Sequence, residues 1–146
     1  MQTPSPNPLE VHLGALTMFR DERGLLSVID ALEENFFQVK RVFFLSHFPI
    51  GVIRGGHGHH LCEQIVICLQ GSLKFSFTLN GKSDSLNLSE GEFIYLPKKT
   101  WSTLESLDAS TLLTVLCSES YNTEDYFYDR EYYKQAWIEN KSNEKR

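Results

Sequence analysis

The chain has 146 residues and a mass of 16.8 kDa, which suits one domain. It carries 14 Lys and Arg residues against 19 Asp and Glu residues, a net charge of −5, so a general nucleic-acid binder is not expected. Hydrophobic residues make up 41% of the chain, and no apolar run approaches the ~20 residues of a membrane span. The three cysteines (Cys62, Cys68 and Cys117) form no CxxC pair, which indicates reduced thiols in a cytoplasmic protein.

We expect a single domain over residues 1–146. The first ten residues contain three prolines and predict a flexible leader, and residues 141–146 predict a polar tail. Between them the composition shows no shift that is typical of a linker, and no repeat of solenoid period.

Short strands are predicted along most of the chain. Residues 61–69 are apolar at both odd and even positions, as in a strand with one face in a closed barrel and the other against neighbouring structure. Residues 73–79 alternate between apolar and polar, which is typical of a half-buried strand. Asn80-Gly81 follows and predicts a tight hairpin, because both residues tolerate positive φ. Further strands are expected at 25–29, 39–46, 86–88, 93–96 and 111–117.

The C-terminal part predicts a helix from Thr123 to about Asn140. Thr123 suits the N-cap position, and Glu124 and Asp125 suit the positive end of a helix dipole. Several short strands with tight turns and one short C-terminal helix predict an all-β fold, an antiparallel barrel or jelly roll.

The chemically rich segment runs from Gly51 to Glu63. His57 and His59 are two residues apart, so on a strand they share a face. Glu63 has the same parity, and the odd positions continue into an apolar run, so we expect all three side chains inside the barrel. His60 has the opposite parity and is expected outside.

Two interpretations of this segment are open. Ionisable groups in an apolar cavity are costly to leave unpaired, so they could form a buried polar network that merely satisfies itself. The glycines at positions 55, 56 and 58 favour a binding site instead, because a backbone without side chains allows close approach of a ligand.

The spacing of Gly51, His57, His59 and Glu63 resembles the first cupin motif, Gly-x5-His-x-His-x3-Glu. Gly91 followed by Pro97 resembles the second motif, which in metal-binding cupins continues to a third histidine. Ser102 stands near that position here. Two histidines and one carboxylate can still hold a metal, but with one of the usual cupin ligands missing we expect no metal and no other cofactor.

A more specific resemblance covers residues 20–133. Residues 54–64, Arg-Gly-Gly-His-Gly-His-His-Leu-Cys-Glu-Gln, resemble the Arg-Gly-x-His-Ala-His-x3-Glu-Gln signature of the nucleotide-sugar 3,4-ketoisomerases, which are small cupins. Arg23-Gly24-Leu25, residues 40–44 and Trp101 also resemble segments of that family. Residues 120–126, Ser-Tyr-Asn-Thr-Glu-Asp-Tyr, resemble its C-terminal Tyr-Asp-x2-Asp-Tyr motif.

This resemblance implies an isomerase that moves the keto group of dTDP-4-keto-6-deoxyglucose from C4 to C3 through an enediol(ate). The product would feed synthesis of a 3-amino-3,6-dideoxyhexose for surface glycans such as lipopolysaccharide, and the enzyme would be a homodimer. Imidazoles suit such proton transfers because their pKa lies near neutrality. We expect His57 to shuttle the carbon-bound proton, His59 to serve the oxygens and Glu63 to orient a histidine. The expected substrate contacts are Arg54, Arg23, Arg41, Glu63, Trp101 and Tyr121.

The chain departs from the family pattern at three places. Gly58 replaces the usual Ala, Ser102 replaces a His that often follows the Trp, and residues 127–130 replace Ile-Arg-x-Tyr with Phe-Tyr-Asp-Arg. The alternatives are a dTDP-sugar 3,5-epimerase, a non-catalytic sugar-nucleotide-binding cupin and, more remotely, a metal-dependent dioxygenase. The His57-Gly-His59 pair and Glu63-Gln64 favour the ketoisomerase.

Overall fold

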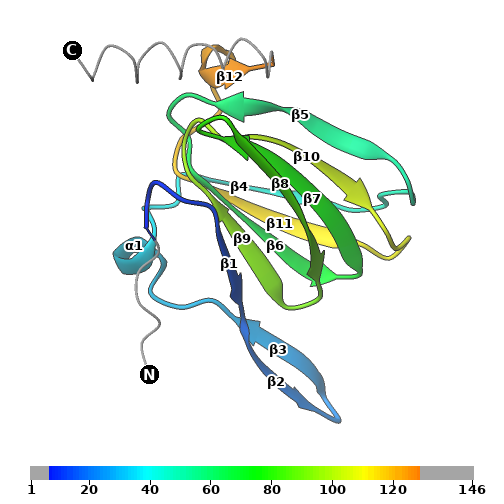
Figure 1. Cartoon of the computed structure of the whole chain (residues 1–146). Helices are drawn as coiled ribbons and strands as arrows, with labels where there is room; N and C mark the ends of the chain where they lie inside the picture. The colour runs from blue at the N-terminus through cyan, green and yellow to red at the C-terminus, as the bar shows by residue number, and fades with distance from the viewer. Residues whose placement is uncertain (1–6, 129–146) are drawn as a thin grey trace, which may run out of the picture.

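The computed structural model describes residues 7–128, which fold almost entirely into antiparallel strands (Figure 1). Two five-stranded sheets face each other, and the strand order of the first is β1 (His12–Ala15), β9 (Glu92–Leu96), β6 (Gln64–Gln70), β11 (Leu112–Cys117) and β4 (Arg41–Leu45). The order of the second is β12 (Tyr126–Phe127), β5 (Ile53–His59), β10 (Trp101–Ser106), β7 (Ser72–Leu79) and β8 (Lys82–Ser89). The all-β antiparallel prediction is confirmed.

Two further elements lie outside the sheets. Strands β2 (Thr17–Asp21) and β3 (Gly24–Val28) form a hairpin that extends away from the two sheets, and the single-turn helix α1 (Leu32–Asn35) follows it (Figure 1). Among the described residues, none of the helical segments has the length and apolar character needed to span a bilayer.

The space between the two sheets holds the main apolar core. Val66 and Cys68 of β6 meet Leu73 and Phe75 of β7 there, together with Val115 of β11, and each of these side chains is at most 2% exposed. Close packing of this kind between two sheet faces gives the fold most of its apolar burial.

The outer face of the first sheet is also covered. Ile65 and Ile67 of β6 pack there with Tyr95 of β9 and with Phe37, from the segment after α1. Strand β6 is therefore apolar on both faces, as predicted. The predicted assignment of those faces is wrong, because the odd positions face outward and the even positions line the interior.

The Asn80-Gly81 hairpin between β7 and β8 is confirmed. Asn80 has φ 53° and Gly81 has φ 75°, and two consecutive positive φ angles match the twist of the flanking strands. The turn fixes the register of the hairpin, in which Leu79 pairs with Lys82.

The predicted start of the C-terminal helix is wrong. Residues Thr123–Asp125 form one turn of 3₁₀ helix, and the chain then enters strand β12. The N-cap is Asn122, whose Oδ1 accepts the N–H of Glu124 at 3.0 Å. Residues 129–140 of the predicted helix, residues 1–6 of the predicted leader and the whole predicted tail lie outside the described residues.

Candidate active site

His57 and His59 lie side by side on β5, as predicted. Their ring centroids are 5.3 Å apart with an interplanar angle of 86°. His59 is 5% exposed, and His57 lines a cavity of about 120 Å³ between the two sheets. The polar lining of that cavity comes from Arg54, His57, Gln64 and Ser102, and the rest is mostly apolar, including Phe43, Val66 and Leu104.

The glycines of β5 serve the fold more than a ligand. A Cβ at Gly55 would lie 2.8 Å from the carbonyl oxygen of Ser102, and one at Gly58 would lie 2.6 Å from that of Thr100. Both positions thus allow close approach of neighbouring backbone, which corrects the interpretation that their purpose is ligand access. A Cβ at Gly56 would meet nothing within 4 Å.

The buried carboxylate of Asp125 positions His59. Its Oδ2 lies 3.2 Å from His59 Nδ1, and the same carboxylate accepts the backbone N–H of Leu61 at 2.7 Å and that of Cys62 at 3.2 Å. The two backbone bonds fix the carboxylate, so the His59 ring is held with Nδ1 as the donor. Nε2 of His59 is buried and has no hydrogen-bond partner among the described residues.

Both imidazoles are neutral at pH 7. Burial and, after it, the neighbouring His57 lower the pKa of His59 to about 4, although Asp125 acts in the opposite direction. Burial also lowers the pKa of His57, against a hydrogen bond to the backbone of Gly55. The contact between His59 and Asp125 is therefore a hydrogen bond from a neutral ring. Each ring keeps a lone pair that can accept a proton.

Glu63 lies on the other side of the first sheet, so its predicted position beside the histidines is wrong. Its Oε1 accepts the Tyr95 hydroxyl at 2.5 Å, and Tyr95 belongs to the outer apolar layer. The parity argument fails because β5 ends at His59 and β6 begins at Gln64. The residues between them follow an irregular path, so alternation does not carry across.

Asp125 takes the orienting role that Glu63 was expected to have. Sequence reasoning placed Asp125 only at the start of a helix. The available signal was its position in the C-terminal motif that resembles the family, because that motif ends in the Asp-Tyr pair that lies against the histidines.

Two of the predicted arginines reach this region. Arg54 lines the cavity with His57. Arg41 of β4 places Nη2 3.5 Å from Cys117 Sγ and its guanidinium carbon 5.5 Å from the centroid of the Tyr121 ring. The positive charge of Arg41 also lowers the pKa of His59. Nε of Arg41 is buried and has no hydrogen-bond partner among the described residues.

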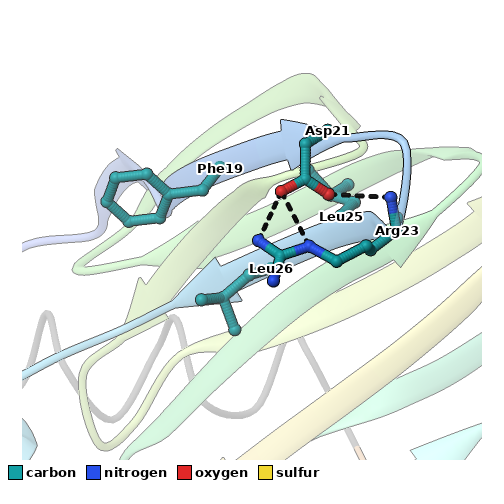
Figure 2. A pocket seen from close by; sticks show the side chains of 6 residues that line it. Phe19, Asp21, Arg23, Leu25 and Leu26 are labelled. Carbon is teal, nitrogen blue, oxygen red and sulfur yellow. Dashed lines mark hydrogen bonds and ion pairs between the residues drawn. The ribbon is translucent and has the colours of Figure 1, made fainter.

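Arg23 lies elsewhere, on the projecting β2–β3 hairpin. Figure 2 shows its guanidinium against Asp21, and the Nη2–Oδ2 distance is 2.6 Å. This pair borders a shallow pocket of about 380 Å³ that includes the exposed side chains of Phe19 and Leu26. The structure therefore does not bring Arg23 to the histidines of its own chain.

Trp101 and Ser102 are neighbours on β10, and their side chains point to opposite faces of the second sheet. Ser102 pairs with His57 and faces the cavity, whereas Trp101 pairs with Gly58 and so faces away from it. Nε1 of Trp101 donates to the carbonyl oxygen of Tyr128 at 3.2 Å. Trp101 therefore does not line this cavity, and its role as a substrate contact stays a prediction.

Tyr126 was not predicted as a site residue, yet its ring lies against both histidines. Its centroid is 4.3 Å from that of His59 and 4.9 Å from that of His57. Tyr121 was predicted as a substrate contact. Its side chain is exposed, and its ring centroid lies 5.9 Å from that of Tyr126. The two tyrosines thus border the site at its C-terminal side.

The two-histidine, one-carboxylate metal set considered from the sequence is not assembled. Glu63 would have to cross the first sheet to join the two histidines, so these residues do not fit a cupin-type metal. The structure instead gathers His59, Cys62 and Asp125, whose potential ligand atoms all lie within 4.8 Å of one another. Asp125 already holds His59 and two backbone N–H groups.

The two-sheet antiparallel fold with paired histidines at one end places the chain in the class of cupin-like sugar isomerases and epimerases. The family model described as "FdtA: WxcM-like, C-terminal" matches residues 9–137, and the chain belongs to this family.

A curated relative supports the isomerase prediction. The TDP-4-oxo-6-deoxy-alpha-D-glucose-3,4-oxoisomerase of Aneurinibacillus thermoaerophilus is 26% identical over 115 residues, which cover 78% of this chain and 83% of the relative.

Solved structures of 3,4-ketoisomerases are also similar to this chain. The sugar 3,4-ketoisomerase QdtA of Thermoanaerobacterium thermosaccharolyticum, crystallised with TDP, is similar with a TM-score of 0.80 and 25% identity, covering 89% of this chain and 96% of QdtA. A 3,4-ketoisomerase from Helicobacter canadensis has a TM-score of 0.79 over 89% of this chain and 98% of its own, and at 23% identity it supports the fold. The resemblance noted from the sequence is confirmed.

Proposed function

We propose that the chain is a sugar-nucleotide isomerase that moves the keto group of dTDP-4-keto-6-deoxyglucose from C4 to C3. The observation that carries this proposal is the pair of neutral imidazoles, 5.3 Å between centroids, at one end of an apolar barrel. The names of the curated relative and of QdtA, with its bound TDP, support the substrate class.

The reaction needs one carbon-bound proton to move between adjacent carbons. His57 removes the proton from C3 and returns it to C4, because its neutral ring borders the cavity and its lowered pKa keeps a lone pair free at neutral pH. The hydrogen bond between the ring and the backbone of Gly55 fixes which nitrogen carries the proton.

The oxygens must exchange protons in the same step, since a C4 carbonyl and a C3 hydroxyl become a C4 hydroxyl and a C3 carbonyl. His59 serves them through Nε2, the nitrogen that Asp125 leaves with a lone pair. It takes the proton from the C3 hydroxyl and delivers it to the C4 oxygen. Arg41 beside His59 adds a positive charge where the enediolate carries its negative charge.

The diphosphate of the substrate requires cations in an acidic protein. Arg54 is the first candidate because it lines the same cavity as His57, and Arg41 is the second. Arg54→Ala should weaken dTDP binding and reduce its salt dependence, which titration calorimetry at two ionic strengths measures. Lys74→Ala on β7, an exposed lysine, is the matched control and should leave both quantities unchanged.

The decisive experiment is incubation of the protein with dTDP-4-keto-6-deoxyglucose in D₂O, followed by NMR. A carbonyl at C3 and deuterium at C4 support the proposal. Exchange at C5 without carbonyl migration would instead indicate the 3,5-epimerase, and binding without exchange of any carbon-bound proton would indicate a non-catalytic sugar-nucleotide-binding protein. The same spectra report the configuration at C4.

We also propose a homodimer. The hairpin exposes Phe19 and Leu26, each 60% exposed, and the edge strand β4 exposes Phe44 at 65%. Apolar side chains of this size gathered on projecting edges favour burial against a second copy, and only a second copy would bring Arg23 near a set of histidines. Light scattering of the wild-type protein and of Phe19→Asp tests this.

The cellular setting is a further proposal. Three free, buried cysteines support a reducing compartment such as the cytoplasm. The 3-keto product is the substrate type that an aminotransferase converts to a 3-amino-3,6-dideoxyhexose, for use in surface glycans. A coupled assay with a sugar aminotransferase and glutamate would detect that product.

A further inference from the structure

Two buried cysteines, Cys62 and Cys117, belong to the core cluster between the two sheets. Cys117 ends β11 and pairs with Gln64 at the start of β6. Cys62 lies in the connection before β6 and belongs to the same buried core cluster as Cys117, and the two side chains interact. Cys117 is fully buried and Cys62 is 2% exposed. The proposed isomerisation uses neither thiol.

The surroundings of Cys117 favour its thiolate. Nη2 of Arg41 and Nε2 of Gln64 each lie 3.5 Å from Cys117 Sγ. The interaction with the Cys62 side chain, and then the hydrogen bonds from Arg41 and Gln64, lower the pKa of Cys117 in spite of its burial. The same contact and burial raise the pKa of Cys62, which stays a thiol. The pair thus consists of an activated sulfur and an adjacent thiol that can resolve it.

The backbone of Cys62 connects this pair to the active site. Its N–H donates to Asp125 Oδ2, the same oxygen that lies 3.2 Å from His59 Nδ1. Cys62 belongs to the connection between β5 and β6, whereas Cys117 is held on both sides by β4 and β6. When the two sulfurs approach to bonding distance, Cys62 is therefore the residue that moves, and its N–H leaves the carboxylate.

We propose that Cys62 and Cys117 form an oxidative modification site, at which a hydroperoxide converts the two thiols to a disulfide and releases His59 from its positioning. The Cys117 thiolate attacks the peroxide, so an S–O bond forms, the O–O bond breaks, and the departing oxide takes a proton to leave as water or an alcohol. The Cys62 sulfur then attacks Cys117, and the S–S bond replaces the S–O bond with loss of water. Two thiols are oxidised and one peroxide is reduced.

The expected consequence is loss of turnover in the oxidised protein. Asp125 loses one of its two backbone donors, and a small displacement of a reacting group costs on the order of 10²-fold in rate. Reduction by a dithiol restores the hydrogen bond and the activity. The effect on turnover rests on the proposed function, whereas formation of the disulfide does not.

The experiment treats the reduced full-length protein with hydrogen peroxide, blocks the remaining thiols with a maleimide after denaturation, and maps the peptides by mass spectrometry. The expected result is a Cys62–Cys117 disulfide with Cys68 as the only thiol that is blocked. The isomerase activity of the same samples should fall as the disulfide forms and return with dithiothreitol. Cys68, whose Sγ donates to the carbonyl oxygen of Gln70, provides the matched control variant, Cys68→Ala.

Cys62→Ala and Cys117→Ala should each retain activity after a peroxide dose that inactivates both the wild-type protein and Cys68→Ala. Three blocked thiols in the peroxide-treated, folded wild-type protein would overturn the proposal. A disulfide that forms without a change in turnover, or equal peroxide sensitivity in Cys62→Ala, would overturn the link to His59. If the protein has no isomerase activity at all, peptide mapping still decides whether the disulfide forms.

Discussion

The ring of Phe127 occupies the space that a side chain at Gly58 would fill. The two residues are paired across β12 and β5, and an added Cβ at position 58 would clash with Cζ of Phe127. Both positions depart from the ketoisomerase pattern, which has Ala and Ile there. The two departures thus compensate each other, because the larger residue on β12 requires the smaller one on β5.

Gly58→Ala should therefore destabilise the protein by about 1–3 kcal/mol, as expected for overpacking. Phe127→Ile in the same chain should recover part of that loss, so the two changes are not additive. Urea unfolding of the two single variants and the double variant measures the coupling. Additive free energies of unfolding would show that Phe127 and position 58 do not interact.

Replacement of His57 tests the proposed base. His57→Asn should lower kcat by about 10²–10⁴-fold, the usual contribution of a general acid–base group, with the thermal unfolding midpoint little changed. His60→Asn is the matched control, because His60 is exposed and contacts Phe127 on the other side of the second sheet. Near-normal turnover in folded His57→Asn would assign the proton transfer to another group.

Asp125→Asn tests the positioning of His59. An amide can still accept the N–H of Leu61, but it holds the His59 tautomer far less strongly than a carboxylate does. We expect kcat to fall by on the order of 10–10²-fold while KM changes little, because the uncharged partner weakens proton transfer and not substrate binding. A rise in KM with kcat unchanged would mean that Asp125 acts on substrate affinity instead.

For Glu63→Gln we expect a loss of stability and almost no loss of kcat, in contrast to Asp125→Asn. Glu63 accepts the Tyr95 hydroxyl on the outer face of the first sheet, so kcat should stay within a few-fold of the wild-type value. Stability should fall by on the order of 1 kcal/mol, because the Tyr95 hydroxyl then donates to a neutral amide oxygen instead of a carboxylate. Chemical denaturation and steady-state kinetics on the same preparation separate the two effects. A large loss of kcat at unchanged stability would return Glu63 to the catalytic machinery.

The stability of the fold should depend on the protonation of His59. Its pKa is about 4 in the folded chain and about 6.5 in the unfolded chain, so between these values the unfolded state binds the extra proton. Stability from this group is complete above the unfolded pKa and falls as the pH drops. The expected loss is about 2 kcal/mol between about pH 7 and pH 5.

His59→Asn removes that contribution and should flatten the pH dependence of unfolding by the same amount. The comparison of the two proteins cancels the titration of carboxylates that they share. Parallel curves for wild type and His59→Asn would mean that the imidazole titrates normally in the folded chain.

The fold was largely predictable because its strands carry strong local signals. The alternation in residues 73–79 and the Asn80-Gly81 turn are local, and they predicted β7 and the hairpin correctly. The edge of the second sheet that β12 forms was less predictable. Strand β12 has only two residues, and its position depends on pairing with β5, a contact that a local pattern does not encode.

The site was predictable only as far as one strand extends. His57 and His59 share a face because both lie within β5, and that inference needed nothing else. Glu63 was misplaced because period-two alternation ends where a strand ends. Asp125 was missed because its partner, His59, is 66 residues away in sequence and acidic residues near a helix start have a commoner explanation.

That long separation has a consequence for synthesis of the protein. A nascent chain that has emerged only as far as β11 already contains both sheets except for β12, and it contains both imidazoles. It lacks the carboxylate that sets the tautomer of one of them. Folding of the barrel and acquisition of catalytic competence are therefore separable events, and competence waits for the last described segment to dock onto β5.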